Sequence, residues 1–433
     1  MTLAEPSDYP DSYYAATRNR STRFAPLSNA TTADVCIIGG GFSGLATALF
    51  LCEQGLDVVL LEARRIGWGA SGRNGGQLVS GYGEETAAVV AAALGAEAGE
   101  RADRLGYRGI ELIADIVERY QIDCDLTWGY LRTAITRREA ASLRGYVAEL
   151  QSHWPGHYLD YRENDDVKKW VGSDAYRSVL YTDNEGHLHP LNLALGEAGA
   201  IQALGGRLYE ESPATRIRID GDGHASTVFT PQGEVRADRL VFCGNAYLEH
   251  LEPRLRKTLI PGYSAIIASE PLPADTRARL LPGNTAVSDL RTVLDYYRFS
   301  DDGRLLWGGL GHWSGGDSNN PEPPLRRRMA RVFPELADVR TDYRWSGRIG
   351  ISVNLNPQIG RLAANVYYAQ AYSGHGVASS HLSGRMISEA ICGGSSDFEM
   401  FAALPHRRIP DFDLVHRLAR AWGMNSRRLI EWL

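Results

Sequence analysis

The residues with the clearest chemical meaning form a glycine-rich turn with the spacing G-x-G-x-x-G, from Gly39 to Gly44. The turn lies between an apolar run typical of a buried strand, Val35–Ile38, and a run with helical apolar spacing, Leu45–Gln54. Gly39 allows a sharp turn, Gly41 lets backbone approach a pyrophosphate, and Gly44 lets the helix pack against the strand. The helix N-terminus then offers N–H groups and a positive dipole end to phosphates. The pattern predicts a dinucleotide site; the alternative is an ordinary strand–turn–helix unit with a chance cluster of glycines.

An acidic residue follows the next expected strand. Glu62 comes directly after the apolar run Val58–Leu61, roughly 20 residues beyond Gly44. In dinucleotide-binding folds an acid at this place binds the ribose hydroxyls, and its charge would repel the 2′-phosphate of NADP. Glu62 therefore argues against NADP but does not separate NAD from FAD.

A long glycine-rich loop, Arg64–Gln77 (RRIGWGASGRNGGQ), follows the acid almost directly. A small NAD-binding domain has no need of such a loop. A flavin cofactor is long, and it needs backbone that passes close to its linker and its ring, which glycines permit. The loop therefore favours FAD.

A second glycine turn, Tyr372–Val377 (YSGHGV), opens another expected helix. Reduced flavin carries negative charge near N1 and the C2 carbonyl, which backbone N–H groups and a helix dipole would stabilise. His375 either adds positive charge there or only braces the turn. Small residues, Cys243 to Asn245, end another buried strand, where a cofactor could lie outside the carboxyl end of a sheet. The alternative is a tight strand-to-loop turn.

The rest of the chain must hold these turns in place, and its apolar periodicity predicts a mixture of helices and strands. A helical region is expected over 84–120 and helices over 138–151 and 191–204, with a last one from 377; expected strands cover 126–136, 207–210, 215–219, 239–246, 263–268, 296–299, 305–310 and 366–371. The alternation of these elements predicts an α/β composite of interleaved segments. We expect an arm at 1–30, cofactor-domain segments at 31–90, 181–250 and 346–395, substrate-domain segments at 91–180 and 251–345, and a tail at 396–433.

Composition excludes several classes of protein. The net charge of −6 gives no basic footprint for nucleic acid, and no apolar run is long enough to span a membrane. Five widely spaced cysteines, mostly in apolar runs, predict reduced core residues, and no His/Cys cluster suggests a metal. The amino terminus is acidic and lacks a signal-peptide core, so we expect a cytoplasmic protein.

His187 and His189 are either ligands or parts of a structural loop before a helix.

Motifs along nearly the whole chain resemble one known family. They are GGGFSGL (39–45), GWGASGRNGGQ (67–77), SYYAAT (12–17), HLHP (187–190), CGNAYL (243–248), SEPL (269–272) and YSGHGV (372–377). In these motifs the chain resembles the D-amino-acid-oxidase superfamily of FAD-dependent amine and amino-acid oxidoreductases, and within it the gamma-glutamylputrescine oxidase subgroup. The resemblance implies a Rossmann-type FAD domain of the glutathione-reductase-like kind, an interleaved antiparallel substrate domain, and a short packed helix at 12–16.

Together, the motifs and the resemblance give a set of candidate FAD-binding residues. They are Gly39, Gly41, Phe42, Ser43, Gly44, Glu62, Ala63, Arg64, Gly69, Ala70, Ser71, Arg73, Asn74, Gly75, Gly76, Gln77, Ala214, Thr215, Cys243, Gly244, Asn245, Gly374, His375, Gly376 and Val377. Some relatives bind flavin covalently through a cysteine or histidine. Residues 350–353 hold no cysteine and the loop 67–76 holds no histidine, so we expect noncovalent FAD.

The expected chemistry is hydride transfer from a C–H bond next to nitrogen to flavin N5, with the protein supplying position and electrostatics. The imine product would hydrolyse to an aldehyde, and O2 or another acceptor would reoxidise the flavin. Candidate catalytic residues are His312, Tyr297 and Arg348. Sarcosine-oxidase-like relatives place a lysine near the flavin, at a position that falls about Gly308 here, which argues against fast use of oxygen.

Aromatic and basic residues of the expected antiparallel sheet are candidates for the substrate pocket. One or two of the aromatics would face the flavin, while the others would be core: Tyr296, Tyr297, Trp307, His312 and Trp313. An arginine could hold a substrate carboxylate bidentately, the alternative being a surface or structural role: Arg291, Arg298 or Arg348.

Three functions are compatible with these residues. The first is an oxidoreductase acting on gamma-glutamylputrescine or a related polyamine-derived amine. The second is a glycine-, sarcosine- or D-amino-acid-type enzyme on the same fold, which would differ only in its pocket. The third is a non-catalytic FAD-binding subunit, against which both intact glycine turns argue.

Overall fold

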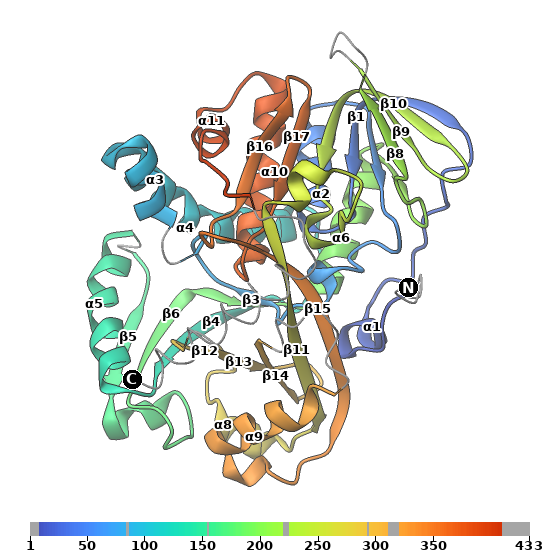
Figure 1. Ribbon diagram of the computed structural model, residues 1–433. Coiled ribbons are helices and arrows are strands. Elements are labelled where there is room, and N and C mark those ends of the chain that lie inside the picture. Colours follow the sequence, from blue (N-terminus) through green and yellow to red (C-terminus); the bar gives the residue numbers. More distant parts are fainter. Residues whose placement is uncertain are drawn as a thin grey trace.

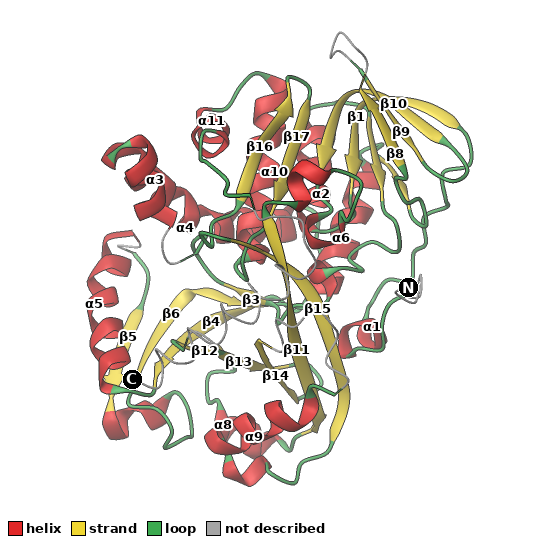
Figure 2. Cartoon of the chain, viewed as in Figure 1, coloured by secondary structure: helices red, strands yellow, loops and turns green. Residues whose placement is uncertain are grey.

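The computed structural model describes residues 8–83, 86–153, 156–219, 225–291, 294–310 and 320–408. The strands form two groups, an upper one and a lower one, with helices packed around both (Figure 1). Figure 2 shows that two long strands of the lower group, β11 and β15, extend up to the upper group. The predicted mixed α/β class is confirmed.

The upper sheet has parallel strands at its centre. Its strands are β1 (Ala30–Ile38), β2 (Val58–Leu61), β7 (Arg207–Tyr209), β8 (Arg216–Ile219), β9 (Ser226–Phe229), β10 (Glu234–Phe242), β16 (Gln358–Ala363) and β17 (Val366–Gln370). The order is β16-β17-β10-β1-β2-β7, with β9 pairing with β10 and β8 with β9. Strands β17, β10, β1, β2 and β7 run parallel, so their carboxyl ends meet at one edge. That edge is where ligands bind in sheets of this kind.

Helices bury the apolar strands of this sheet. They are α2 (Phe42–Glu53), α4 (Ala96–Arg119), α6 (Pro190–Ala203), α10 (Gly376–Cys392) and α11 (Ser396–Ala402). Helix α2 is buried over almost its whole length between α6 and α10. Gly384 permits the close approach of α10, because a Cβ at this position would lie 2.7 Å from the Cβ of Ala46.

The lower sheet is mainly antiparallel and supports the other side of the molecule. Its strands are β3 (Gln77–Leu78), β4 (Thr127–Ala134), β5 (Leu159–Glu163), β6 (Ser178–His187), β11 (Leu259–Pro271), β12 (Ala286–Asp289), β13 (Asp295–Phe299), β14 (Arg304–Leu310) and β15 (Thr341–Ser352). Trp307, Tyr297 and Phe333 form the aromatic centre of its core. The helices α8 (Ala274–Leu280) and α9 (Glu322–Val332) lie below this sheet in Figure 1.

Short elements complete the described chain. They are α1 (Tyr13–Thr17), α3 (Thr86–Leu94), α5 (Arg137–His153), α7 (Pro253–Arg256) and the 3₁₀ turns η1 (Ala70–Gly72), η2 (Asn164–Lys169), η3 (Asn245–Tyr247) and η4 (Pro334–Leu336). Helix α1 is the short packed helix expected near the amino terminus. Ser12 caps it, accepting a hydrogen bond from the Ala15 N–H.

The expected helical region and segment ends can be compared with the observed elements. The helical region expected over 84–120 holds two helices, α3 and α4, which are separated by Gly95 with its φ of 97°. Predicted segment ends after residues 90, 180 and 345 fall inside α3, β6 and β15. A strand that runs from one region into another keeps the same alternation, so its sequence does not mark the crossing.

Two kinds of feature are absent from the described residues. None of their helices is long and apolar enough to cross a bilayer. Within the same ranges, no three His, Cys, Asp or Glu side chains are grouped as metal ligands.

The core of the lower sheet gives a stability prediction. Trp307 is fully buried, and its replacement by Ala should lower the free energy of unfolding by about 3–5 kcal/mol through lost packing. Trp128 is 43% exposed, so Trp128→Ala should change the free energy of unfolding by less than about 0.5 kcal/mol. Urea unfolding followed by far-ultraviolet circular dichroism measures both. Equal losses in the two variants would contradict this account of the core.

Candidate active site

The first glycine turn has the geometry that its spacing predicts. Strand β1 ends at Ile38, and α2 begins after Gly41, its N-cap. Gly39 has a φ of 112°, and a Cβ there would lie 2.8 Å from the carbonyl carbon of Cys243. A Cβ at Gly44 would lie only 1.9 Å from the carbonyl oxygen of Gly39. No side chain fits at these positions, so the turn brings bare backbone to the carboxyl edge of the sheet.

Glu62 lies at the end of β2, directly beside this turn. One of its carboxylate oxygens accepts the Gly40 N–H at 2.7 Å, and the other accepts the Arg64 N–H at 2.8 Å. Burial raises the pKa of Glu62, while these two N–H donors oppose the rise. The carboxylate is held in a fixed position, and its remaining lone pairs fit hydroxyl donors such as those of a ribose.

The loop after Glu62 folds back over the start of α2. The Ser71 hydroxyl accepts the Phe42 N–H at 2.9 Å, and a Cβ at Gly41 would lie 2.8 Å from that hydroxyl. Asn74 braces the loop from inside, donating to the Ala70 and Ser71 carbonyls and accepting the Gly76 N–H at 2.8 Å. The role of Asn74 is thus to shape the loop.

Two buried donors of this loop have no partner among the described residues. They are Nη2 of Arg73 and Nε2 of Gln77. The other nitrogens of Arg73 donate to the carbonyls of Trp68 and Ser346, at 2.7 and 3.4 Å. Unpaired buried donors are costly, so this pair fits a bound group that offers acceptors. The flavin ring and its ribityl chain offer both carbonyl and hydroxyl oxygens.

The end of β10 closes the site from the other side. The Cys243 N–H donates to the Ile38 carbonyl at 2.8 Å, which aligns the strand end with the first glycine turn. Asn245 accepts the Ala371 N–H at 3.1 Å through its side chain. The small residues at the end of β10 are therefore explained by the close approach of its backbone to the first glycine turn.

The second glycine turn meets the first. Helix α10 begins at Gly376 after a turn in which Gly374 has a φ of 102°. The Tyr372 and Ser43 hydroxyls are 2.6 Å apart and join this turn to the first turn of α2. His375 is the N-cap residue, but its side chain makes no capping hydrogen bond. Two helix N-termini thus converge at one edge of the sheet, which favours a ligand with negative charge.

The remaining predicted cofactor residues lie in or beside these segments. The Glu211 N–H donates to the Arg64 carbonyl and the Ser212 N–H donates to the Glu62 carbonyl, each at 2.9 Å. Residues 211–212 therefore pair with the backbone on both sides of Ala63. The others are Gly69, Gly75, Ala214, Thr215, Gly244 and Val377. The structure brings the two turns, the loop and the end of β10 together from four separate stretches of sequence.

The tyrosine pair 296–297 is divided between the two faces of β13. Tyr297 is fully buried, stacks on Trp307 with centroids 4.4 Å apart, and contacts the Tyr176 hydroxyl at 3.0 Å. Its position is that of a core residue, so the catalytic role predicted for Tyr297 is not supported. The Tyr296 hydroxyl lies 2.9 Å from the Ser264 hydroxyl on the opposite face. Alternation along a strand separates the two rings, but the sequence does not say which faces the site.

The Tyr296 ring also explains why two neighbouring positions are glycine. A Cβ at Gly75 would lie 2.5 Å from this ring, and a Cβ at Gly308 would lie 2.1 Å from it. The space beside Gly308, near which the resemblance to sarcosine-oxidase-like relatives placed the position of their lysine, is filled by Tyr296. His312 and Trp313 lie outside the described residues.

The three candidate arginines have different surroundings. Arg291 is paired with Asp289 and Asp295. Arg298 is buried and donates to backbone carbonyls, including Gly75 at 2.9 Å. The Arg348 side chain is 21% exposed, and its guanidinium lies over two aromatic rings, those of Tyr247 and Tyr263, with Glu249 at 3.7 Å. Arg348 differs from Arg291 in that its carboxylate partner is more distant, and from Arg298 in that its side chain is partly exposed.

The two histidines before α6 have structural surroundings. His189 caps α6, accepting the Asn192 N–H at 3.1 Å, and His187 contacts the Asn284 carbonyl at 3.0 Å. Burial, reinforced by Arg298, lowers the pKa of each histidine to about 3, so both are neutral. The structural alternative is the one that the geometry supports.

A parallel sheet with a glycine turn, an acid at the next strand end and a second helix N-terminus is the architecture of a dinucleotide-binding protein. The chain belongs to the FAD dependent oxidoreductase family known as DAO, whose model matches residues 34–390. The resemblance predicted from the motifs is confirmed. The chain is accordingly an FAD-dependent oxidoreductase.

The chain is similar to known proteins over nearly its whole length. It is 40% identical to gamma-glutamylputrescine oxidoreductase of Escherichia coli, covering 93% of this chain and 94% of that protein. It is 34% identical to the probable oxidoreductase OrdL of Haemophilus influenzae, covering 97% of each. Among solved structures, glycine oxidase from Geobacillus kaustophilus matches with a TM-score of 0.71 and 21% identity, covering 87% of this chain and 99% of that one. This last likeness shows the shared fold.

Sequence reasoning missed some residues that organise the site. Ser264 and Trp345 were not singled out for the site, and the amino-terminal arm was not connected to it. A lone serine or tryptophan within a strand carries no local signal. Arg298 was expected either to hold a substrate carboxylate or to be structural, and in the structure it holds the loop through the Gly75 carbonyl.

The packing of the first turn gives a prediction for cofactor binding. Gly44→Ala should abolish retention of FAD during purification, because its Cβ would collide with the Gly39 carbonyl at 1.9 Å. The matched control is Gly145→Ala on α5, where a Cβ would meet nothing within 4 Å. The ratio of flavin absorbance to protein absorbance measures the outcome. Full flavin content in the Gly44 variant would contradict the assigned geometry.

Proposed function

We propose that this protein binds FAD noncovalently and oxidises the C–N bond of gamma-glutamylputrescine or a related polyamine-derived amine. The observation that carries the proposal is the convergence of both glycine turns, Glu62 and the loop Arg64–Gln77 at one sheet edge. The relative from Escherichia coli, named gamma-glutamylputrescine oxidoreductase, supports the substrate class. When bound, FAD supplies the hydride acceptor for a C–H bond next to nitrogen.

The chain's own residues would bind and orient the cofactor. The N-terminus of α2 would hold the pyrophosphate, and Glu62 would accept from the ribose. Arg73 Nη2 and Gln77 Nε2, which have no partner among the described residues, would donate to acceptors farther along the cofactor. The N-terminus of α10 would stabilise negative charge on the ring through its dipole and N–H groups.

Substrate selection would fall to the sheet beneath the loop. Arg348 is the proposed anchor for a carboxylate, because its guanidinium is partly exposed and flanked by two tyrosine rings. Tyr296 is the proposed apolar wall, in place of Tyr297. The imine product would hydrolyse in water to an aldehyde. O2 or another acceptor takes the electrons, and the filled space at Gly308 favours slow use of O2.

The two alternatives raised by the sequence differ from this proposal in the substrate pocket or in whether the bound flavin is reduced. A glycine-, sarcosine- or D-amino-acid-type substrate would use the same cofactor site. A non-catalytic subunit would bind FAD without reducing it. A cytoplasmic location remains a prediction from the sequence.

Flavin reduction separates these functions. Mixed anaerobically with gamma-glutamylputrescine, the protein should lose its absorbance near 450 nm, roughly where oxidised flavin absorbs, because hydride on N5 removes that band. Sarcosine, glycine and D-alanine should leave it unchanged. The flavin should pass into the supernatant on acid precipitation if it is noncovalent. Bleaching only by an amino acid would contradict the substrate class, and no bleaching by any amine would favour the non-catalytic alternative.

Substrates with and without a carboxylate test Arg348. Arg348→Met should raise KM for gamma-glutamylputrescine by about 10- to 100-fold, because a charge-assisted hydrogen bond to the carboxylate is lost. KM for putrescine, which has no carboxylate, should change little. Arg361→Met is the control, since Arg361 pairs with Glu399 on the surface. Equal effects of Arg348→Met on both amines would contradict the proposed anchor.

A further inference from the structure

An amino-terminal arm, residues 8–27, lies outside the family match at 34–390 and contacts the glycine-rich loop Arg64–Gln77. We propose that this arm is a positioning part of the FAD site, which fixes both ends of the loop and so sets the affinity for FAD. The inference rests on the proposed function in one respect, that the loop binds FAD. It assigns to the arm a role that the sequence analysis did not give it.

The first end of the loop is held directly. The Tyr9 hydroxyl donates to the Ile66 carbonyl at 2.7 Å, and the Trp68 indole N–H donates to the Asp8 carbonyl at 3.0 Å. The Asp8 carboxylate lies 3.3 Å from the Arg65 guanidinium. Three contacts from two adjacent arm residues thus reach three positions of the loop.

A buried carboxylate joins the same two segments. Glu210 accepts the Ile66 N–H at 2.7 Å and the Arg65 Nε–H at 2.8 Å, and both donors belong to the loop. The same carboxylate accepts the Phe24 N–H of the arm at 3.1 Å. Glu210 is almost fully buried, so loss of any of these donors would leave a buried charge less well compensated.

The second end of the loop is held through Tyr14. Its hydroxyl accepts from Nη2 of Arg298 at 3.2 Å, and Nε of Arg298 donates to the Gly75 carbonyl at 2.9 Å. The Tyr14 ring also packs edge-on against Trp345, whose indole N–H donates to the Arg73 carbonyl at 2.9 Å. Tyr14 is fully buried and therefore supports Arg73 and Gly75 by two routes.

Arg298 transmits this support rigidly because its donors are in use. It also donates to the Leu188 carbonyl at 2.8 Å and to the Phe299 carbonyl at 3.1 Å. A planar guanidinium with several fixed acceptors has one orientation. The Tyr14 hydroxyl is one of these acceptors, so its loss would weaken the hold on the orientation that places Nε of Arg298 at the Gly75 carbonyl.

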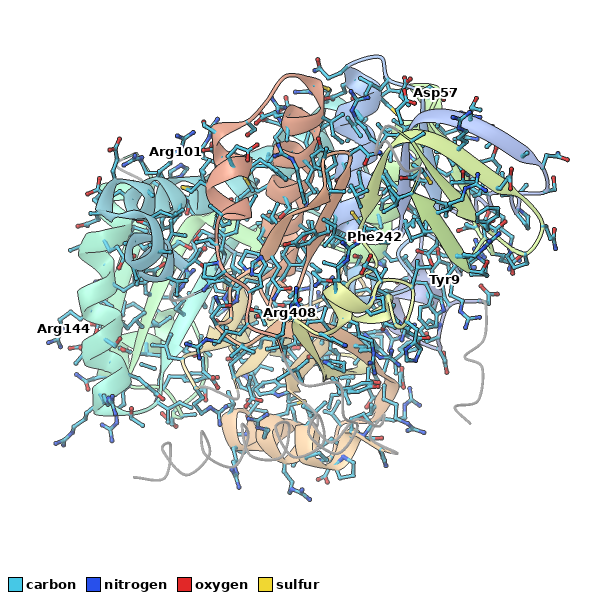
Figure 3. All side chains as sticks on the ribbon, turned by 45° about the horizontal axis from the view of Figure 1, so that its top comes forward. Tyr9, Asp57, Arg101, Arg144, Phe242 and Arg408 are labelled. Atoms are coloured by element: carbon cyan, nitrogen blue, oxygen red, sulfur yellow. The ribbon has the colours of Figure 1, made fainter. Side chains whose placement is uncertain are left out.

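The arm is buried at Ser12–Ala15 and again at Phe24, and it is mostly exposed between them. Helix α1 lies beside the junction of the upper and lower groups of strands (Figure 1). Figure 3 shows Tyr9 and Arg144, which is on α5, on opposite sides of the molecule. Arg20 and Arg23 are exposed on the connecting stretch. If the arm holds the loop for FAD, then FAD must hold the arm in return, because coupling between two sites is reciprocal.

Three single hydroxyl deletions test the inference. Tyr9→Phe and Tyr14→Phe remove a bond to the loop or to Arg298 and keep the ring, whereas Tyr13→Phe removes a bond to Asp302 at 2.8 Å that does not reach the loop. Titration of apoprotein with FAD should give dissociation constants raised about three- to tenfold for Tyr9→Phe and Tyr14→Phe. For Tyr13→Phe the change should stay within about twofold, since its lost bond has no path to the loop. Apoprotein unfolding midpoints show whether each variant is folded.

Trypsin gives a second readout that a purely structural role would not change. In the wild type, FAD should slow cleavage after Arg20 and Arg23, and this protection should shrink in the Tyr9 and Tyr14 variants only. Equal FAD affinities in all four proteins would overturn the inference. Trypsin cleavage at the same rate with and without FAD would overturn it as well. A wild type that binds no FAD would instead overturn the proposed function.

Discussion

The structure depends on one close contact, between the first turn of α2 and the turn that precedes it. A Cβ at Gly44 would lie 1.9 Å from the Gly39 carbonyl, so the helix can start there only without a side chain. This contact fixes the direction of α2, and α2 in turn is buried between α6 and α10. The position of the second helix N-terminus follows, because Tyr372 is joined to Ser43.

The site is then completed by segments that cross between the two sheets. The loop Arg64–Gln77 leaves β2 of the upper sheet and ends in β3 of the lower sheet, where Gln77 pairs with His187. Its glycines let it pass close to Tyr296 and to the Leu188 carbonyl. A glycine-rich segment of this kind needs support to hold a precise shape, which Asn74 provides from within and Arg298 and the arm provide from outside.

Likeness to relatives and local geometry contribute different parts of the functional argument. The family match identifies the cofactor class, and the fold is shared with amino-acid oxidases of low identity. The shared fold does not decide the substrate, because function resides in sites placed on a common fold, and we proposed Arg348 and Tyr296 for that choice. The space beside Gly308 is filled by the Tyr296 ring.

The sequence alone determined the glycine turns, Glu62 and the type of most elements, because these depend on spacing and periodicity within short stretches. It therefore predicted the fold class, the family and a connected set of cofactor residues. Only the tertiary structure decided that Tyr296 faces the site and Tyr297 the core, and that Arg291 and Arg298 are engaged within the protein. It also placed Tyr9 against a loop residue 57 positions away in sequence, and Tyr14 against Arg298 and Trp345, which bond to the same loop. The physical reason is that periodicity gives two faces of a strand without saying which is inside, and long-range contacts leave no local pattern.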